Sequence, residues 1–225
     1  MSRTIMVINP NTTRAMTDTV VAAAGAVATT GTKLVGGTPT EGVPSVESHV
    51  EEVWGAVGVL DQVRAGEKSG VDGYVVACFG DTGVAAAREL ARGPVVGMTE
   101  AALFTAALVA PRFTIVTLPR RTREMSERVL RETGLAHRCT VRAIDVPVAD
   151  IAEGSLHELE AVAAEASLGL QQDAAEAVVL GCAGLADLVA PLEQRLGVPV
   201  IEGVSAAVTM VEGLLAQGLA KRRRP

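Results

Sequence analysis

GYVVAC at residues 73–78 and AVVLGC at residues 177–182 are two versions of one short pattern, and they decide the fold of this 225-residue chain. Each is an apolar run that ends in a cysteine. A turn of small residues follows each of them, FGDTG at 79–83 and AGLAD at 183–187. Repetition of a motif at a distance indicates two copies of one structural unit. The sequence therefore predicts a duplicated scaffold with one such cysteine in each half.

The repeat extends beyond the cysteines in both directions. TIMVINPN at 4–11 is similar to FTIVTLPR at 113–120, and PVVG from Pro94 matches PVIEG from Pro199. No linker rich in Gly, Pro or Ser separates the two halves, so we expect them to pack tightly against each other.

Short Val/Ile-rich runs alternate with longer amphipathic stretches. Continuous apolar runs are typical of strands that are buried on both faces, as in parallel sheets. The expected strands lie at 4–8, 33–36, 73–78, 94–97, 112–117, 140–146, 177–181 and 198–201. Between them, apolar residues recur at helical spacing, as in 50–63. The alternation predicts an α/β fold of two pseudo-symmetric, Rossmann-like halves, each a parallel sheet with helices on both faces.

The repeat also sets the expected domain boundaries. The first α/β domain comprises 1–97 together with 204–225, because a last helix at 204–218 is expected to return to the first half. The second α/β domain comprises 98–203. We expect the active site between the two.

Composition excludes several classes of partner. The net charge is −6 and aromatic residues make up only 2%, so a basic or base-stacking face for nucleic acid is not expected. The KRRRP run at 221–225 is better interpreted as a solvated tail than as a phosphate contact. The longest uncharged stretch, 19–32, has 14 residues, fewer than the roughly 20 that cross a membrane. We expect a cytoplasmic protein whose three cysteines are reduced thiols.

Cys78 and Cys182 are the first candidates for chemistry. Each lies at the carboxyl end of an expected parallel strand, where ligands gather in α/β sheets. A helix that follows is expected to lower the thiol pKa through its dipole and so make the thiolate a competent base. A free cysteine is often only a small core residue, and Cys139, which has no counterpart, is interpreted that way. Two cysteines at matching places favour function.

Two thiols related by a pseudo-twofold axis suit one type of reaction. Racemisation removes a proton from one face of a carbon and returns one to the other face. One group cannot easily reach both faces, whereas a thiolate base and a thiol acid that face each other can. Their roles would swap for the other enantiomer, and the pair would titrate as a unit.

The loops near the cysteines supply candidate binding residues. Asn11, in NPNTT, is a candidate helix N-cap and substrate contact. Thr117 occupies the matching loop of the second half, where Arg120 and Arg121 are expected on a surface helix. Phe79 could form an apolar wall.

Main-chain N–H groups at a helix start can hold a developing oxyanion. Gly80, Ala183 and Gly184 offer such groups in the turns after the two cysteines. Asp81 is interpreted as an N-cap, and His49 as the start of a surface helix.

Several other types of site are absent from the sequence. It contains no CxxC, no HExxH and no metal-ligand spacing among its three histidines. GxGxxG and GxxxxGK[ST] are also absent, so neither a dinucleotide nor a nucleoside triphosphate is expected. We expect neither a metal nor a cofactor.

The chain resembles the aspartate/glutamate/hydantoin racemase superfamily, and within it hydantoin and allantoin racemases. The resemblance covers about residues 4–218. Its most specific parts are the two cysteine motifs. It rests on VINPNTT at 7–13, VPSVESH at 43–49, DGYVVACFGDTG at 72–83, LGCAGLADL at 180–188 and VPVIEGVSAA at 198–207.

The resemblance implies a two-domain α/β sandwich with the site between its halves, a cofactor-free acid–base pair of Cys78 and Cys182, and a homo-oligomer. It also implies a pocket whose lining is Asn11, Val46, Phe79, Gly80, Thr117, Ala183 and Gly184. The superfamily's amino-acid racemases carry Asn-Thr and Thr after their cysteines. This chain carries Phe79-Gly80 and Ala183-Gly184, which favours a neutral cyclic ureide. It also departs from the hydantoin-racemase pattern in the loop at 45–48.

The expected function is therefore racemisation of a 5-substituted hydantoin or of allantoin. Three rivals come from the same superfamily: a decarboxylase of the arylmalonate type, a cis–trans isomerase of the maleate type and an amino-acid racemase. Decarboxylation needs only one proton donor, so two retained thiols argue against it, but they do not exclude cis–trans isomerisation. A rival of another class is a small-molecule-binding α/β module without turnover, which would tolerate loss of either cysteine.

Overall fold

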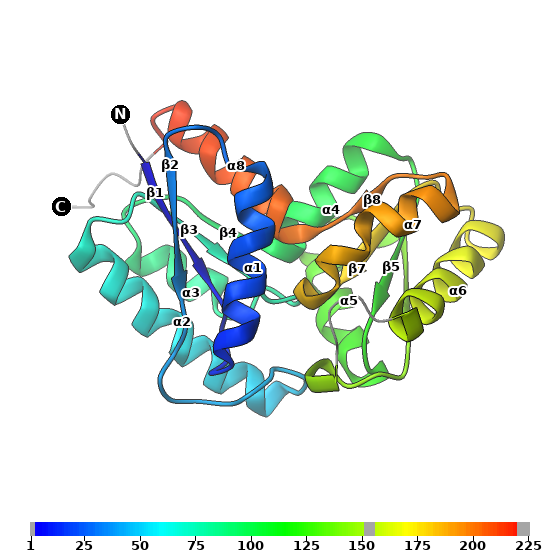
Figure 1. Ribbon diagram of the computed structural model, residues 1–225, viewed down its shortest axis with the longest axis horizontal. Helices are drawn as coiled ribbons and strands as arrows, with labels where there is room; N and C mark the ends of the chain where they lie inside the picture. Colours follow the sequence, from blue (N-terminus) through cyan, green and yellow to red (C-terminus); the bar gives the residue numbers. More distant parts are fainter. Residues whose placement is uncertain (1–2, 151–155, 220–225) are drawn as a thin grey trace.

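Two four-stranded parallel sheets form the framework of the protein. The computed structural model describes residues 3–150 and 156–219. The strands are β1 (Arg3–Ile8), β2 (Thr32–Gly37), β3 (Gly73–Val76), β4 (Val95–Gly97), β5 (Phe113–Thr117), β6 (Cys139–Ala143), β7 (Val178–Gly181) and β8 (Val200–Ile201). The first sheet has the order β2-β1-β3-β4 and the second the order β6-β5-β7-β8. The two halves thus repeat one topology, side by side in Figure 1.

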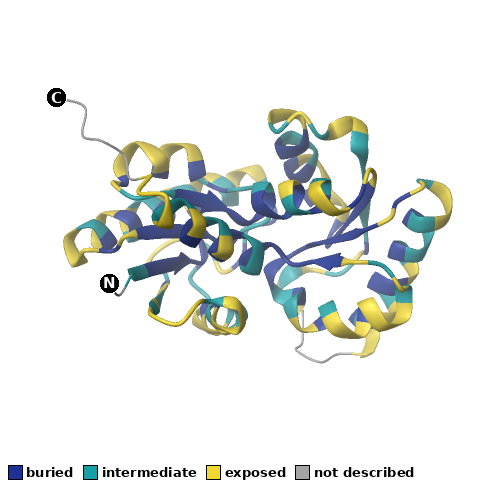
Figure 2. Cartoon of the chain, turned by 90° about the horizontal axis from the view of Figure 1, so that it is seen from above, coloured by how far each residue is buried: buried dark blue, intermediate teal, exposed yellow. Residues whose placement is uncertain are grey.

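Helices cover both faces of each sheet. The α-helices are α1 (Arg14–Val27), α2 (His49–Ser69), α3 (Val84–Leu90), α4 (Met98–Val109), α5 (Arg123–Glu132), α6 (Leu156–Gln172), α7 (Val189–Leu196) and α8 (Gly203–Ala216). Short 3-10 helices are η1 (Arg120–Thr122), η2 (Ala136–Arg138), η3 (Val148–Asp150) and η4 (Ala183–Leu188). Figure 2 shows buried strands between helices whose outer faces are exposed. The expected α/β fold class is confirmed.

The alternation of side chains along each central strand divides the core into layers. On β1, Ile5 and Val7 pack with residues of α1 and α8, whereas Met6 and Ile8 pack with residues of α2 and α3. The second half has the same arrangement, with α6 and α7 on one face of the sheet and α4 and α5 on the other. Burial of both faces explains why the strands are continuous apolar runs.

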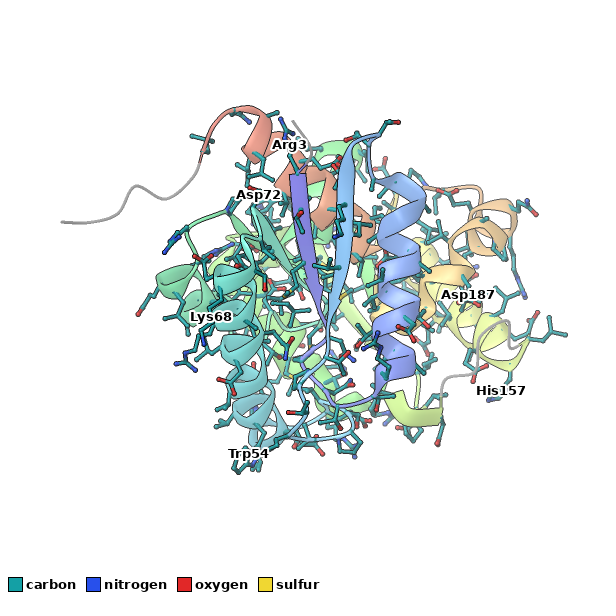
Figure 3. All side chains as sticks on the ribbon, turned by 60° about the vertical axis from the view of Figure 1, so that its left-hand side comes forward. Arg3, Trp54, Lys68, Asp72, His157 and Asp187 are labelled. Carbon is teal, nitrogen blue, oxygen red and sulfur yellow. The ribbon has the colours of Figure 1, made fainter. Side chains whose placement is uncertain are left out.

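The expected helix in 50–63 is present, but only part of its apolar stripe faces the core. Val50, Val53, Trp54 and Val57 are all exposed, and the side chain of Trp54 lies on the outside of α2 (Figure 3). The inner face of α2 combines the buried side chains of Val59 and Val63 with the small residues Gly55, Gly58 and Gly66. A Cβ atom at Gly58 would lie 2.6 Å from a carbon of Pro39. Close approach through glycines therefore adds to the apolar contacts that hold α2.

The last helix returns to the first half of the chain, as expected. Residues of α8 pack with those of α1 and β1, and Glu212 of α8 ties it to the turn before β2. The Glu212 carboxylate accepts hydrogen bonds from the Thr29 N–H at 3.0 Å and from the Thr32 hydroxyl at 2.5 Å. Arg3, labelled in Figure 3, donates to the Glu212 carbonyl oxygen. We propose that 1–97 with 204–225 and 98–203 are the two domains, although 220–225 lie outside the described residues.

No helix among residues 3–150 and 156–219 is both long and apolar enough to cross a membrane. The basic run at 221–225 lies outside these ranges, so its interpretation as a solvated tail stays a prediction.

Glu212→Ala tests the attachment of α8. We expect the free energy of unfolding at pH 7 to fall by roughly 1–3 kcal/mol, because the hydrogen-bond donors of Thr29 and Thr32 lose a charged acceptor. Burial raises the pKa of Glu212, but hydrogen bonds from Thr32 and Thr29 outweigh it and leave the pKa lowered. A lowered pKa means that this stabilisation is present above the unfolded carboxyl pKa of about 4.3 and is lost as the pH falls below it.

Urea unfolding between pH 7 and pH 3 measures both effects. The control is Asp18→Ala, which removes an exposed ion pair with Arg14 and should cost less than about 1 kcal/mol. Equal losses in the two variants, or a Glu212→Ala effect that does not shrink in acid, would contradict this role.

Candidate active site

One cavity lies where the carboxyl ends of the four central strands meet. β1 and β3 are neighbours in the first sheet, and β5 and β7 are neighbours in the second. The segments that follow these strands all contribute to the cavity, whose lining is Asn9, Pro10, Asn11, Met16, Val46, Ala77, Cys78, Phe79, Thr117, Leu118, Thr122, Val148, Gly181, Cys182 and Ala183. Ligands bind at this edge of parallel sheets.

The cavity is small. Its volume is about 40 Å³, which is enough for a few water molecules only. Ligand pockets commonly measure about 300–1,000 Å³. A substrate the size of a five-membered ring with a side chain therefore needs the two halves, or the loops between them, to move apart.

Cys78 follows β3 after one intervening residue. Its thiol accepts a hydrogen bond from the Thr82 hydroxyl, with 3.3 Å between oxygen and sulfur. Burial raises the pKa of Cys78 to about 12; the Thr82 hydrogen bond lowers it, and the nearby Cys182 raises it. Both cysteines line the same cavity.

Cys182 follows β7 directly and caps the 3-10 helix η4. Its thiol is buried, and burial raises its pKa to about 11, against a hydrogen bond from the Gly184 N–H that lowers it. The sequence-based expectation of lowered thiol pKa values was therefore wrong. Desolvation in the apolar cavity outweighs the main-chain dipoles.

The turn between Cys78 and α3 is held by its neighbours. Asp81 accepts hydrogen bonds from the N–H groups of Thr99 and Glu100, at 2.8 and 2.9 Å. The expectation that Asp81 is an N-cap was wrong, because Gly83 is the N-cap of α3 and Gly97 that of α4. The Asp81 carboxylate instead binds main-chain N–H groups in the first turn of α4. Burial raises the pKa of Asp81 to about 7, against these main-chain hydrogen bonds. The Gly80 N–H donates to the Thr99 hydroxyl at 2.7 Å.

Two asparagines organise the loop after β1. The Asn9 side-chain amide donates to the Asn11 side-chain oxygen at 2.8 Å, and that oxygen also accepts from the Thr13 N–H. Helix α1 has Thr13 at its N-cap position, so the expectation that Asn11 is the N-cap was wrong. Among the described residues, the Asn11 amide nitrogen has only the sulfur of Met16 as an acceptor, at 3.4 Å. It is therefore the most available side-chain donor at the cavity.

Buried Glu47 bridges the two halves beside the cavity. Its carboxylate accepts from the Val148 N–H at 3.2 Å and from Ser45 at 3.0 Å, and it pairs with Arg121. Val46 and Val148, on either side of this bridge, both line the cavity. The bridge therefore holds the loop at 45–48 over the site.

The model of the family Asp/Glu/Hydantoin racemase matches residues 5–211. The chain belongs to this family. A hydantoin racemase of Rhizobium meliloti is 40% identical over 96% of this chain and 90% of the relative. An allantoin racemase structure from Klebsiella pneumoniae has 49% identity and a TM-score of 0.94 over 98% of this chain and 91% of that chain. One from Pseudomonas fluorescens has 39% identity and a TM-score of 0.93, over 99% and 97%.

The structure of this family member brings most of the expected site residues together. Both cysteines line the cavity, as do Asn11, Val46, Phe79, Thr117 and Ala183. Gly80 and Gly184 are not part of the lining. Gly80 instead lines a separate polar cavity beyond the turn, and Gly184 donates its N–H to Cys182. The Thr117 hydroxyl is engaged with Thr122 and the Gly181 carbonyl oxygen.

Several residues outside the cavity lie where the sequence predicted. His49 begins α2, is mostly exposed and lies near Glu52 and Glu124. Arg120 is exposed, and Arg121 lies largely exposed while it pairs with Glu47.

Sequence reasoning missed part of the lining and the residues that support it. Asn9, Met16 and Val148 line the cavity, Thr82 binds the Cys78 sulfur, and Glu47 bridges the halves. Asn9 and Thr82 lie in motifs that the sequence analysis singled out, so their polar side chains were a usable signal. Val148 has no repeat partner in a motif and was not detectable in this way. Among the described residues no cluster of three or more His, Cys, Asp or Glu side chains is placed to hold a metal ion.

The raised pKa values predict the reactivity of the two thiols. The thiolate is the reactive form, so alkylation of Cys78 and Cys182 by iodoacetamide should rise about tenfold per pH unit between pH 7 and pH 10. Peptide mass spectrometry measures each rate separately. The same peptides in urea, where the thiol pKa is about 8.5, should level off near pH 9 and provide the control. A plateau below pH 8 in the folded protein would show that the thiol pKa values are not raised.

Proposed function

We propose that the protein is a cofactor-independent racemase that inverts C5 of a 5-substituted hydantoin or of allantoin, with Cys78 and Cys182 as its acid–base pair. Membership of the family makes it an isomerase of the racemase type. The observation that supports the mechanism is that the two thiols, one from each half, line one cavity at the carboxyl ends of β3 and β7. The high identity to hydantoin and allantoin racemases supports the cyclic ureide as substrate.

The proposed reaction is a pair of proton transfers. In one direction the thiolate of one cysteine takes the C5 proton, and the C–H electron pair moves into the adjacent ring carbonyl to give an enolate. The thiol of the other cysteine then gives its proton to the opposite face of C5. When the product leaves, the negative charge remains on the sulfur that donated its proton. The reverse reaction starts from this thiolate. Atoms and charge balance without a metal or an organic cofactor.

The polarity of the cavity suits this chemistry. A thiol whose pKa is raised by burial becomes a stronger base when it is ionised, which favours removal of a weakly acidic C–H proton. The available N–H groups of Asn11 offer a hydrogen bond to a ring carbonyl, where negative charge develops. Phe79, Met16, Val46 and Val148 supply apolar walls. These contacts suit a neutral ring better than the charged groups of a free amino acid.

The test uses one enantiomer of a 5-substituted hydantoin, or of allantoin, in heavy water. We expect deuterium to enter C5 as the optical rotation decays. Cys78→Ser and Cys182→Ser should each lower the racemisation rate by roughly 10²–10⁴-fold, since each removes one acid–base group. Cys139→Ser is the matched control and should keep the wild-type rate, because Cys139 lies outside the cavity lining.

The single-cysteine variants separate the two proton transfers. Each is expected to lose racemisation yet to exchange the C5 proton of one enantiomer only, by the thiol that remains. Wild-type racemisation in either variant would eliminate the two-thiol mechanism. Absence of turnover in the wild type across both substrates would favour the binding-module alternative. The assembly as a homo-oligomer and the cytoplasmic location stay predictions.

A further inference from the structure

The turn that carries Thr82 is strained. Gly80, Asp81 and Gly83 all have positive φ, at 120°, 55° and 73°. A non-glycine residue such as Asp81 adopts this region at an energetic cost and does so mostly where the surroundings enforce it. Here the two N–H groups at the start of α4 hold the Asp81 carboxylate. The hydrogen bonds to the first turn of α4 thus offset the backbone strain at Asp81. The turn stays close to Cys78, whose carbonyl oxygen accepts the Asp81 N–H at 3.1 Å.

Thr82 is buried in this turn, and both its methyl group and its hydroxyl group have close neighbours. Its methyl group faces α2, where a Cβ atom placed on Gly55 would lie 3.2 Å from it. Its hydroxyl donates to the Cys78 sulfur at 3.3 Å. Contact on the methyl side leaves the hydroxyl little freedom to turn elsewhere.

In the second half of the protein, the cysteine sulfur has a different kind of hydrogen-bond donor. Cys182 receives its hydrogen bond from the Gly184 N–H, a main-chain group. The turn after Cys182 is the 3-10 helix η4, which lacks residues with positive φ. The position that follows Cys182 by four residues is Ala186, which has no hydroxyl. The two sulfurs of a pseudo-symmetric pair are therefore held by unlike donors.

We propose that Thr82 is a positioning residue for Cys78: its hydroxyl orients the sulfur toward the cavity and stabilises the thiolate, whereas Cys182 depends on the main chain alone. The inference rests on the proposed function, because it concerns one of the two proton transfers. Removal of this single hydroxyl should weaken proton transfer by Cys78 and leave proton transfer by Cys182 intact.

The charges around Cys78 make the Thr82 donor important. The titratable groups that act on Cys78 are Cys182, Asp81 and Glu52, and all of them disfavour its thiolate. The hydroxyl of Thr82 is the group that acts in the opposite direction. A hydrogen bond to an ionised sulfur is stronger than one to a neutral thiol, so its benefit appears in the reactive form.

The test combines Thr82 variants with the two single-cysteine variants. In Cys182→Ser only Cys78 can exchange the C5 proton, and in Cys78→Ser only Cys182 can. Adding Thr82→Val to Cys182→Ser should slow deuterium exchange roughly 10- to 100-fold, the loss expected for a hydrogen bond to a charged group. Adding it to Cys78→Ser should change the rate by less than about twofold, because the Thr82 hydroxyl donates to the Cys78 sulfur and not to the Cys182 sulfur.

Thr82→Ser is the matched control, since it keeps the hydroxyl and should keep most of the exchange by Cys78. Equal slowing of both cysteines by Thr82→Val, or failure of Thr82→Ser to restore exchange, would show a merely structural role and overturn the inference.

A second readout needs no turnover. In the protein with both cysteines, Thr82→Val should lower the alkylation rate of Cys78 by iodoacetamide relative to that of Cys182, and Thr82→Ser should not. An unchanged ratio overturns the role of Thr82 even if racemisation is observed. A changed ratio supports it even if the hydantoins tested are not racemised, which separates failure of this inference from failure of the proposed function.

Discussion

The protein depends on one constraint, the desolvation of two sulfur atoms where the carboxyl ends of two parallel sheets converge. Each sheet places its two central strands beside this point, and the chain after each of those strands turns into the same small cavity. Burial there raises the pKa of both thiols above that of an ordinary cysteine. The fold thus creates an environment that opposes ionisation of the groups on which the proposed chemistry depends.

Local donors counter this cost to different extents. Cys78 receives a side-chain hydroxyl that a strained turn orients, and Cys182 receives a main-chain N–H. The bridge from Glu47 to Arg121 and Val148 joins the two halves beside the cavity.

Much of this could be predicted from the sequence, because a duplicated motif carries its own geometry. The repeat of GYVVAC as AVVLGC predicted the parallel sheets, their matching topology and the place of both cysteines. It could not predict the sign of the thiol pKa shifts, which depends on how completely loops such as that at 45–48 cover the sulfurs. Nor could it predict that α2 packs partly through glycines, because an apolar stripe with Trp54 looks like a core face when only spacing is considered. Contacts such as that of Glu47 with Val148 join distant segments of the chain, and sequence periodicity does not predict them.

The proposed mechanism requires both sulfurs to approach one carbon from opposite faces. A crystal structure with a bound 5,5-disubstituted hydantoin, which has no C5 proton to lose, shows whether they do. The Cys78 and Cys182 sulfurs should lie on opposite sides of C5, each facing one of its two substituents. A ring bound with both sulfurs on one side of C5, or bound outside the cavity between the two sheets, would contradict this mechanism.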